Sequence, residues 1–162
     1  MLEKINSPAD LKGLSVQQLK TLAAEMRETI VKQVAAKGGH LASSLGTVDL
    51  TLAIHTVYNA PEDKVVWDTG HQAYPHKLVT GRYKDFHTLK QFGGLSGFLK
   101  RDESPYDAFG AGHATTSLSA ALGMAAARSQ LGKDYNVIGI IGDGSMTGGM
   151  AYEALNNAGE IN

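Results

Sequence analysis

From position 15 onward, apolar side chains recur three and four residues apart, which is the spacing of one face of an α-helix. The apolar positions are Leu19, Leu22, Ala23, Met26, Ile30 and Val34. Ser15 and Gln18 match a capping box at the start of this pattern, and Leu14 is placed to form a hydrophobic staple with Leu19. The glycine pair at 38–39 is a typical helix end. The sequence therefore predicts a long amphipathic helix between these two signals.

A polar segment and two shorter helices are expected next. Residues 40–46 are predicted to form a loop. Thr47 is a candidate N-cap for a second helix, from Val48 to about Tyr58. Residues 61–63 indicate a turn, and a further short helix is expected from His76 to about Phe86.

Two short apolar runs have the character of buried strands. Residues 64–68 form a β-branched run bounded by turn residues. Residues 135–141 are the strongest strand candidate, and such apolar runs are typical of parallel strands covered on both sides. Because helical patterns alternate with these strands, we expect an α/β fold, with a layered parallel sheet and helices on both faces.

The second half of the chain contains a long irregular segment and two helices. Residues 92–112 are rich in glycine and show no periodicity, and a loop of that length is often functional. A helix rich in small residues follows at about 114–127, with Thr115 or Thr116 as its candidate cap. The last helix is predicted at about 149–159.

Composition excludes several classes of protein. The chain has 162 residues, 43% hydrophobic and 19% charged, as expected for a folded globular domain. Fifteen basic and sixteen acidic residues give a net charge of -1, so there is no electrostatic footprint for nucleic acid. The absence of cysteine excludes disulfides and thiolate catalysis. No secretory signal or membrane-length apolar run is visible, so we expect a cytoplasmic protein with neither nucleic acid nor membrane as a partner.

The glycine content, 19 residues, is the one unusual feature of the composition. Two of these glycines flank the aspartate at position 143. Gly142-Asp143-Gly144 follows the second predicted strand, where ligands of parallel α/β sheets bind. An aspartate there suits Mg²⁺ held together with phosphate oxygens. Thr147 replaces the third glycine of a dinucleotide-binding fingerprint, which argues against that class. An ordinary Asp-Gly turn is an equally good explanation of this motif taken alone.

Histidine placement gives a second indication of chemistry. His40, His71 and His113 each follow a glycine at the end of a predicted element or in a loop, where an imidazole can exchange protons with a ligand. Any single loop histidine is more commonly solvated or structural. We expect His55 to pack on its helix, and two further histidines, His76 and His87, to lie on the surface.

Five segments carry a more specific pattern when taken together. They are Gly-His-Gln-Ala-Tyr-Pro-His at 70–76, Gly-Gly-Leu-Ser-Gly-Phe at 93–98, Ser-Pro-Tyr-Asp at 104–107, Gly-His-Ala-Thr-Thr-Ser at 112–117, and Gly-Asp-Gly at 142–144 followed by Asn-Asn-Ala at 156–158. As a set they resemble the 1-deoxy-D-xylulose-5-phosphate synthase family of bacteria and plastids. These enzymes join pyruvate to D-glyceraldehyde 3-phosphate with release of CO₂, and the product feeds isoprenoid, thiamine and pyridoxal phosphate synthesis.

The resemblance implies thiamine diphosphate and Mg²⁺ as cofactors, and it assigns catalytic roles to two histidines. His40 matches a histidine implicated in proton transfer around the substrate, with Ser43 on the same segment. His71 matches a histidine near the active centre that also contacts the cofactor.

The same resemblance implies the remaining ligands of the cofactor. Asp143 matches the Mg²⁺ ligand. Expected cofactor contacts come from two short segments and are Gly112, His113, Ala114, Gly144 and Ser145. Many relatives have serine where Ala114 stands.

Enzymes of this family are several times longer than 162 residues. The resemblance therefore implies that residues 1–162 are the N-terminal part of a diphosphate-binding domain that is incomplete at its C-terminal end. The pyrimidine-binding and C-terminal domains, the remainder of the same enzyme and a second copy in a homodimer are then expected partners. Two alternatives stay open: another thiamine-diphosphate-dependent enzyme of the transketolase type, and a binding module without catalysis.

Overall fold

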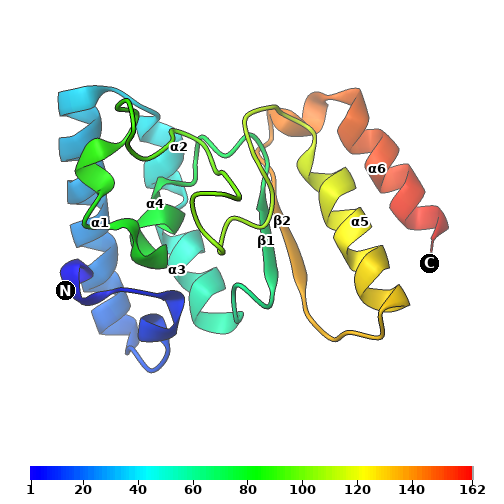
Figure 1. Cartoon of the computed structure of the whole chain (residues 1–162), viewed down its shortest axis with the longest axis horizontal. Coiled ribbons are helices and arrows are strands. Elements are labelled where there is room, and N and C mark those ends of the chain that lie inside the picture. The colour runs from blue at the N-terminus through cyan, green and yellow to red at the C-terminus, as the bar shows by residue number, and fades with distance from the viewer. Residues whose placement is uncertain (162) are drawn as a thin grey trace. The chain divides into compact units, whose positions relative to one another are not determined.

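The computed structural model describes residues 1–161 and combines helices with a parallel two-stranded sheet, an α/β arrangement (Figure 1). Asn162, the last residue of the predicted domain, lies outside the described residues. The chain divides into two compact units. The first unit consists of Met1–Asn59 and His71–Gly97, and the second consists of Ala60–Gly70 and the chain from Phe98 onward.

The long helix of the first unit, α1, spans Val16–Lys37 and begins as the sequence predicts. The backbone N–H of Ser15 donates to Gln18 Oε1 at 2.8 Å, and the N–H of Gln18 donates to Ser15 Oγ at 3.3 Å. This reciprocal pair satisfies two N–H groups that a helix start leaves open. At the other end Gly38 adopts a φ of 77°, which ends the helix.

Shorter helical elements complete the first unit. They are η1 (Leu2–Lys4), η2 (Pro8–Leu11), α2 (Leu41–Gly46), α3 (Val48–Val57), α4 (Tyr74–Lys77), η3 (Leu78–Arg82) and η4 (Phe86–Thr88). The prediction of a loop at 40–46 was wrong, because this segment forms α2. The predicted helix at 76–86 is confirmed only in part, since it is broken into short pieces at Thr80 and Gly81.

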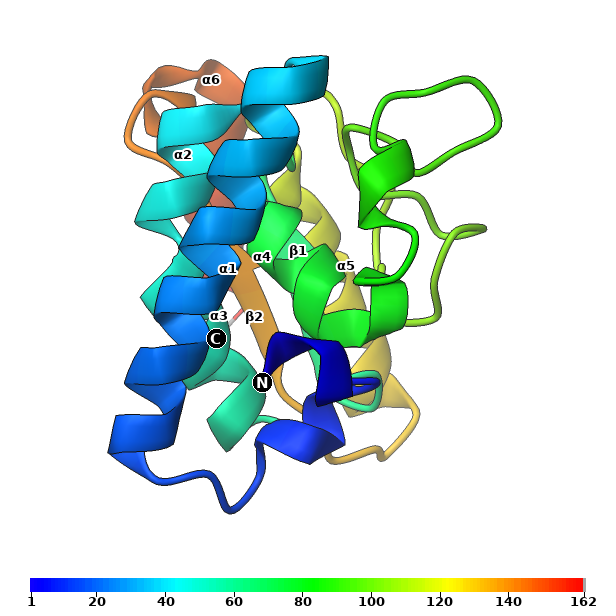
Figure 2. The ribbon, with the colours of Figure 1, turned by 90° about the vertical axis from the view of Figure 1, so that its left-hand side faces the viewer.

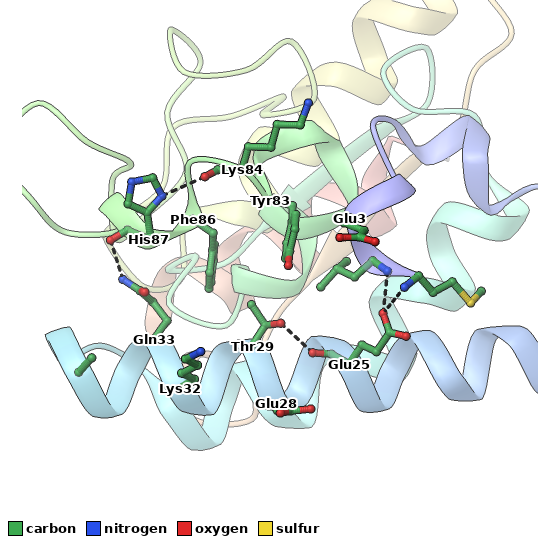
Figure 3. A pocket seen from close by; sticks show the side chains of 13 residues that line it. Glu3, Glu25, Glu28, Thr29, Lys32, Gln33, Tyr83, Lys84, Phe86 and His87 are labelled. Carbon is green, nitrogen blue, oxygen red and sulfur yellow. Dashed lines mark hydrogen bonds and ion pairs between the residues drawn. The ribbon is translucent and has the colours of Figure 1, made fainter.

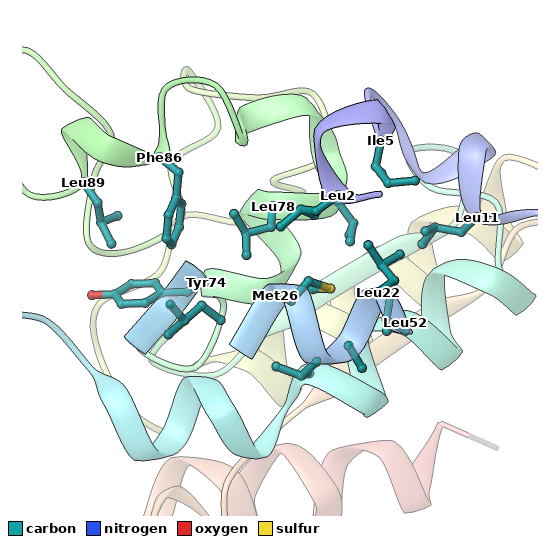
Figure 4. Close-up of a cluster of buried hydrophobic side chains, with 14 of the residues drawn as sticks. Leu2, Ile5, Leu11, Leu22, Met26, Leu52, Tyr74, Leu78, Phe86 and Leu89 are labelled. Atoms are coloured by element: carbon teal, nitrogen blue, oxygen red, sulfur yellow. The ribbon is translucent and has the colours of Figure 1, made fainter. Parts of the chain in front are cut away.

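The core of the first unit lies between α1 and the segments that pack on it. Helix α1 contacts α2, α3 and α4, as the views from two sides show (Figures 1 and 2). Figure 4 shows Leu22 and Met26 of α1 facing Tyr74 and Leu78, all of them fully buried. The apolar stripe predicted from the spacing of α1 is therefore the face that builds this core.

The second unit holds the sheet. Strands β1 (Lys64–Trp67) and β2 (Val137–Ile140) pair in parallel. Helix α5 (Ser117–Gln130) packs on both strands and on α6 (Gly149–Glu160), and η5 (Ser145–Thr147) precedes α6 (Figure 1). Both predicted strands are confirmed, although each is shorter than its apolar run.

Residues 92–112 contain no helix or strand, as predicted. No helix within residues 1–161 combines the length and the apolar character that crossing a bilayer requires.

Candidate functional site

In the first unit, His40 and His71 lie against each other. Their ring centroids are 5.6 Å apart in an edge-to-face arrangement. His40 occupies the N-cap position of α2, although its side chain does not cap the helix. The two histidines that the sequence predicts to be catalytic are therefore neighbours within one unit.

Helix α2 and the residue after it hold His71 in place through its backbone. Ser44 Oγ donates to the carbonyl oxygen of His71 at 3.1 Å, and Thr47 Oγ1 donates to that of Gln72 at 2.6 Å. Thr47 lies at the start of α3 as predicted, but its hydroxyl reaches Gln72 instead of capping the helix. Two hydroxyl groups thus fix the segment that carries His71.

The imidazoles of this pair differ in their surroundings. Nδ1 of His71 is buried and has no hydrogen-bond partner among residues 1–161. A buried polar atom without a hydrogen-bond partner costs free energy of folding. A bound molecule that makes a hydrogen bond to this nitrogen would remove that cost. Burial, with His71 and Lys90 nearby, holds the pKa of His40 below its usual value. His40 is therefore neutral at neutral pH, which leaves one of its ring nitrogens able to donate and the other able to accept.

In the second unit, Asp143 lies in the turn directly after β2 and is exposed. Its carboxylate makes no hydrogen bond or ion pair with any other residue that the structure describes. A Cβ added at Gly142 or Gly144 would meet no atom within 4 Å, so the backbone on either side of Asp143 is uncrowded. Among residues 1–161, no three His, Asp or Glu side chains gather as a metal site. A single exposed carboxylate such as that of Asp143 fits a hard cation that completes its shell with phosphate oxygens.

Asp68 is the residue of this region that sequence reasoning missed. It follows β1, is fully buried, and its N–H continues the ladder to the carbonyl oxygen of Ile140 at 2.7 Å. Its carboxylate accepts hydrogen bonds from the N–H of Thr115 at 2.9 Å and from that of Ser117 at 3.1 Å. An aspartate directly after a buried strand is the signal that could have identified it.

Thr116 occupies the N-cap position of α5, as predicted, but its side chain makes no capping hydrogen bond, and the acceptor at the helix start is the Asp68 carboxylate. Burial acts to raise the pKa of Asp68, but the neighbouring hydroxyls of Ser117 and Ser145 and the two N–H groups outweigh it and hold the pKa below its usual value. The carboxylate is thus charged and anchors the start of α5.

This anchor brings two predicted cofactor segments to the same edge of the sheet. The loop with Gly112, His113 and Ala114 runs directly into Thr115, which Asp68 holds. Thr115 in turn contacts Gly148, so closely that no side chain fits there. His113 and Ala114 are exposed, and so are the backbone positions at 142–144. The turn after β2 and the loop before α5 are therefore neighbours at the carboxyl ends of the strands.

The remaining histidines fall into two groups. His87 is exposed, as predicted, and borders a cavity of about 690 Å³ between α1 and the segment at 83–87 (Figure 3). Figure 3 shows Glu25 and Lys32 from α1 at this cavity, which none of the predicted catalytic or cofactor residues lines. The prediction that His76 lies on the surface was wrong, because its side chain is fully buried against His55.

Comparison with known proteins gives one consistent family. The family profile described as 1-deoxy-D-xylulose-5-phosphate synthase matches residues 2–162. Proteins of that name from Dictyoglomus thermophilum and Thermomicrobium roseum are 64% and 65% identical to the chain over 162 and 161 residues. A protein named 1-deoxy-D-xylulose-5-phosphate synthase 2 from Geobacter sulfurreducens is 60% identical over 162 residues. The chain spans about 26% of the length of these relatives.

Proposed function

Because the chain belongs to the 1-deoxy-D-xylulose-5-phosphate synthase family, we propose that it is the N-terminal, diphosphate-binding part of an enzyme that condenses pyruvate with D-glyceraldehyde 3-phosphate and releases CO₂. The observation that carries this proposal is identity of 64% over the whole chain, which includes every segment of the sequence pattern. The relatives named above are all called 1-deoxy-D-xylulose-5-phosphate synthase, which argues against the alternative of a transketolase-type enzyme.

The second unit is the proposed binding region for Mg²⁺ and the diphosphate. Asp143 supplies the carboxylate ligand of the metal, and Gly144 and Ser145 contact the diphosphate through the backbone after β2. The exposed position of Asp143 and its uncrowded backbone support this role. The N-terminus of α6, a helix of 12 residues that follows directly, adds favourable electrostatics for an anion.

The loop before α5 is the proposed second contact. Gly112, His113 and Ala114 approach the cofactor from the segment that Asp68 anchors. Thiamine diphosphate, when bound, supplies the carbanion chemistry of the reaction. The protein residues bind it, orient it and exchange protons with the substrate.

The first unit supplies the proton chemistry in this proposal. His40 exchanges a proton with the substrate at a ring nitrogen, and the unpartnered Nδ1 of His71 makes a polar contact with the cofactor or substrate. The whole enzyme is proposed to be a cytoplasmic homodimer that serves isoprenoid, thiamine and pyridoxal phosphate synthesis.

The test uses the full-length enzyme that contains this segment. We expect CO₂ release from pyruvate only when D-glyceraldehyde 3-phosphate is present, and no turnover of the ketose donors that a transketolase uses. Asp143→Ala should abolish the Mg²⁺-dependent part of thiamine diphosphate binding in calorimetric titrations, because the metal loses its protein carboxylate.

The matched control is Asp134→Ala, which removes an exposed carboxylate shortly before β2. This variant should bind the cofactor as the wild type does. Unchanged Mg²⁺-dependent affinity in Asp143→Ala would leave Asp143 as an ordinary turn residue. Turnover of ketose donors instead of pyruvate would contradict the proposed reaction.

A further inference from the structure

Tyr74 connects the core of the first unit to the imidazole of His40. Its side chain is fully buried, and its ring packs edge-to-face on Phe86 with centroids 6.1 Å apart. Figure 4 shows the hydroxyl of Tyr74 at the margin of the apolar cluster, pointing away from Leu22 and Leu78. The apolar part of the ring is thus fixed by the core, and the core determines where the hydroxyl lies.

The hydroxyl contacts the same histidine twice. The backbone N–H of His40 donates to the phenol oxygen at 3.2 Å, and that oxygen lies 3.3 Å from Nδ1 of the His40 ring. The preceding residue allows this close approach because it is glycine. Gly39 has a φ of 145°, and a Cβ there would lie 2.8 Å from the phenol oxygen.

The direction of these hydrogen bonds follows from counting protons. A backbone N–H can only donate, so the phenol oxygen accepts from it. The phenol has one proton, and within residues 1–161 the structure gives it no acceptor other than Nδ1. A buried hydroxyl that makes no donor bond is costly. The phenol proton therefore points at Nδ1, which must carry a lone pair.

We propose that Tyr74 is a positioning residue that holds neutral His40 in the tautomer protonated at Nε2. Nε2 then carries the N–H of the ring, so that His40 faces its ligand as a hydrogen-bond and proton donor. The inference rests on the proposed function in one respect, the role of His40 in turnover. The tautomer itself rests only on contacts within the first unit.

The charges around the pair are consistent with this assignment. Burial raises the pKa of Tyr74, so the phenol keeps its proton. Burial of His40 disfavours a second proton on its imidazole, and the His71 ring and the Lys90 ammonium act in the same direction. A neutral ring beside a protonated phenol is therefore the stable combination at neutral pH.

The experiment is Tyr74→Phe in the full-length enzyme, with two readouts. Mass spectrometry of hydrogen–deuterium exchange at the imidazole C2 position gives the pKa of each histidine separately. Losing a donor to Nδ1 removes an interaction that only neutral His40 makes, so the pKa of His40 should rise by about 0.4–1. Turnover should fall by roughly 3- to 10-fold in kcat, with KM for pyruvate little changed.

Two further variants sharpen the result. Tyr83→Phe is the matched control, because Tyr83 packs on the same core and has no contact with a catalytic histidine. It should leave the pKa of His40 and kcat unchanged. Replacement of Tyr74 by 3-fluorotyrosine keeps the shape and makes the phenol a stronger donor, so the pKa of His40 should fall. This variant preserves the test should Tyr74→Phe fold poorly.

An unchanged pKa of His40 in Tyr74→Phe would overturn the tautomer assignment, and a raised pKa with unchanged kcat would overturn the role of that tautomer in turnover. Failure of the proposed function has a different signature. In that case the wild-type enzyme would not release CO₂ from the two substrates, whereas the pKa comparison, which needs no turnover, would still decide whether Tyr74 fixes the tautomer.

Discussion

At the scale of single residues, two buried histidines, His55 and His76, form a hydrogen-bonded pair whose burial disfavours protonation of His55. His55 Nε2 and His76 Nδ1 are 2.9 Å apart, and both side chains are fully buried. One nitrogen must donate and the other must accept. Nδ1 of His55 is also buried without a partner among the described residues. Burial, His76 and the Lys12 ammonium lower the pKa of His55 from 6.5 to about 3.

The pair should make stability depend on pH. The unfolded chain binds a proton at His55 near pH 6.5, but the folded chain does so only near pH 3. The free energy of unfolding should therefore be highest above pH 6.5 and fall as the pH is lowered toward 3, by up to about 1.4 kcal/mol per pH unit. Thermal unfolding of wild type and His55→Gln between pH 8 and pH 5 measures this. Glutamine does not titrate, so the variant should lose less stability on acidification.

The exposed His87 provides the control for that measurement. His87→Gln should keep the pH dependence of the wild type. An equally steep loss of stability in wild type and His55→Gln would assign the effect to other groups.

The same pair shows what sequence reasoning could and could not provide for single residues. His55 lies within the helix predicted at 48–58 and was expected to pack there, which agrees with its burial. His76 gave no such signal, because its partner is 21 residues away in the chain. The great majority of buried polar groups have a hydrogen-bond partner, and that partner is set by tertiary structure.

At the scale of elements, the start of α5 depends on a carboxylate from another part of the second unit. The N–H of Thr115, just before the helix, and the N–H of Ser117, its first residue, donate to Asp68, which is 47 and 49 residues earlier in the chain. Local pattern predicted α5 and its small residues but suggested a threonine cap. A cap from a distant strand end leaves no mark at the helix itself. In the same way, the six residues of α2 are too few to show periodicity, although its packing on α1 and α3 is clear in the structure.

Removing the Asp68 carboxylate should loosen the start of α5. Asp68→Ala leaves two N–H groups without an acceptor, which should lower stability by about 1–3 kcal/mol. The pKa of Asp68 is lowered on folding, so this contribution is present above its unfolded pKa and is lost as the pH falls through the folded one. Amide hydrogen exchange should show faster exchange in the first turn of α5. Asp102→Ala, at an exposed aspartate, should leave that exchange unchanged.

At the scale of the whole molecule, the described residues hold one end of the proposed cofactor site. Asp143 is the carboxylate proposed to bind the metal there, and the sheet has two strands. Helix α6 also leaves apolar side chains exposed, among them Tyr152 and Leu155. The sequence predicted which segments approach the cofactor, and the structure places two of them together at one edge of the sheet. The ligand roles themselves stay predictions, because they depend on bound groups.

The 162-residue chain expressed alone should therefore bind thiamine diphosphate weakly and release no CO₂ from the two substrates. Binding costs roughly several kcal/mol in lost translational and rotational freedom. The binding free energy from one carboxylate and one helix terminus is too small to offset that cost. Co-expression with the complementary C-terminal part should restore turnover. A lone chain that turns over the substrates would contradict this expectation.

The parallel pairing of β1 with β2 also sets a minimum delay between the synthesis of β1 and its pairing with β2. Lys64 pairs with Val137, and the adjacent bond from Asn136 to Asp63 spans 73 residues of chain. A ribosome that adds about 5–20 residues per second needs roughly 4–15 s to produce the intervening segment. During that interval, the apolar strand Lys64–Trp67 has left the ribosome without its neighbour, with its hydrogen-bonding edge open to other nascent chains.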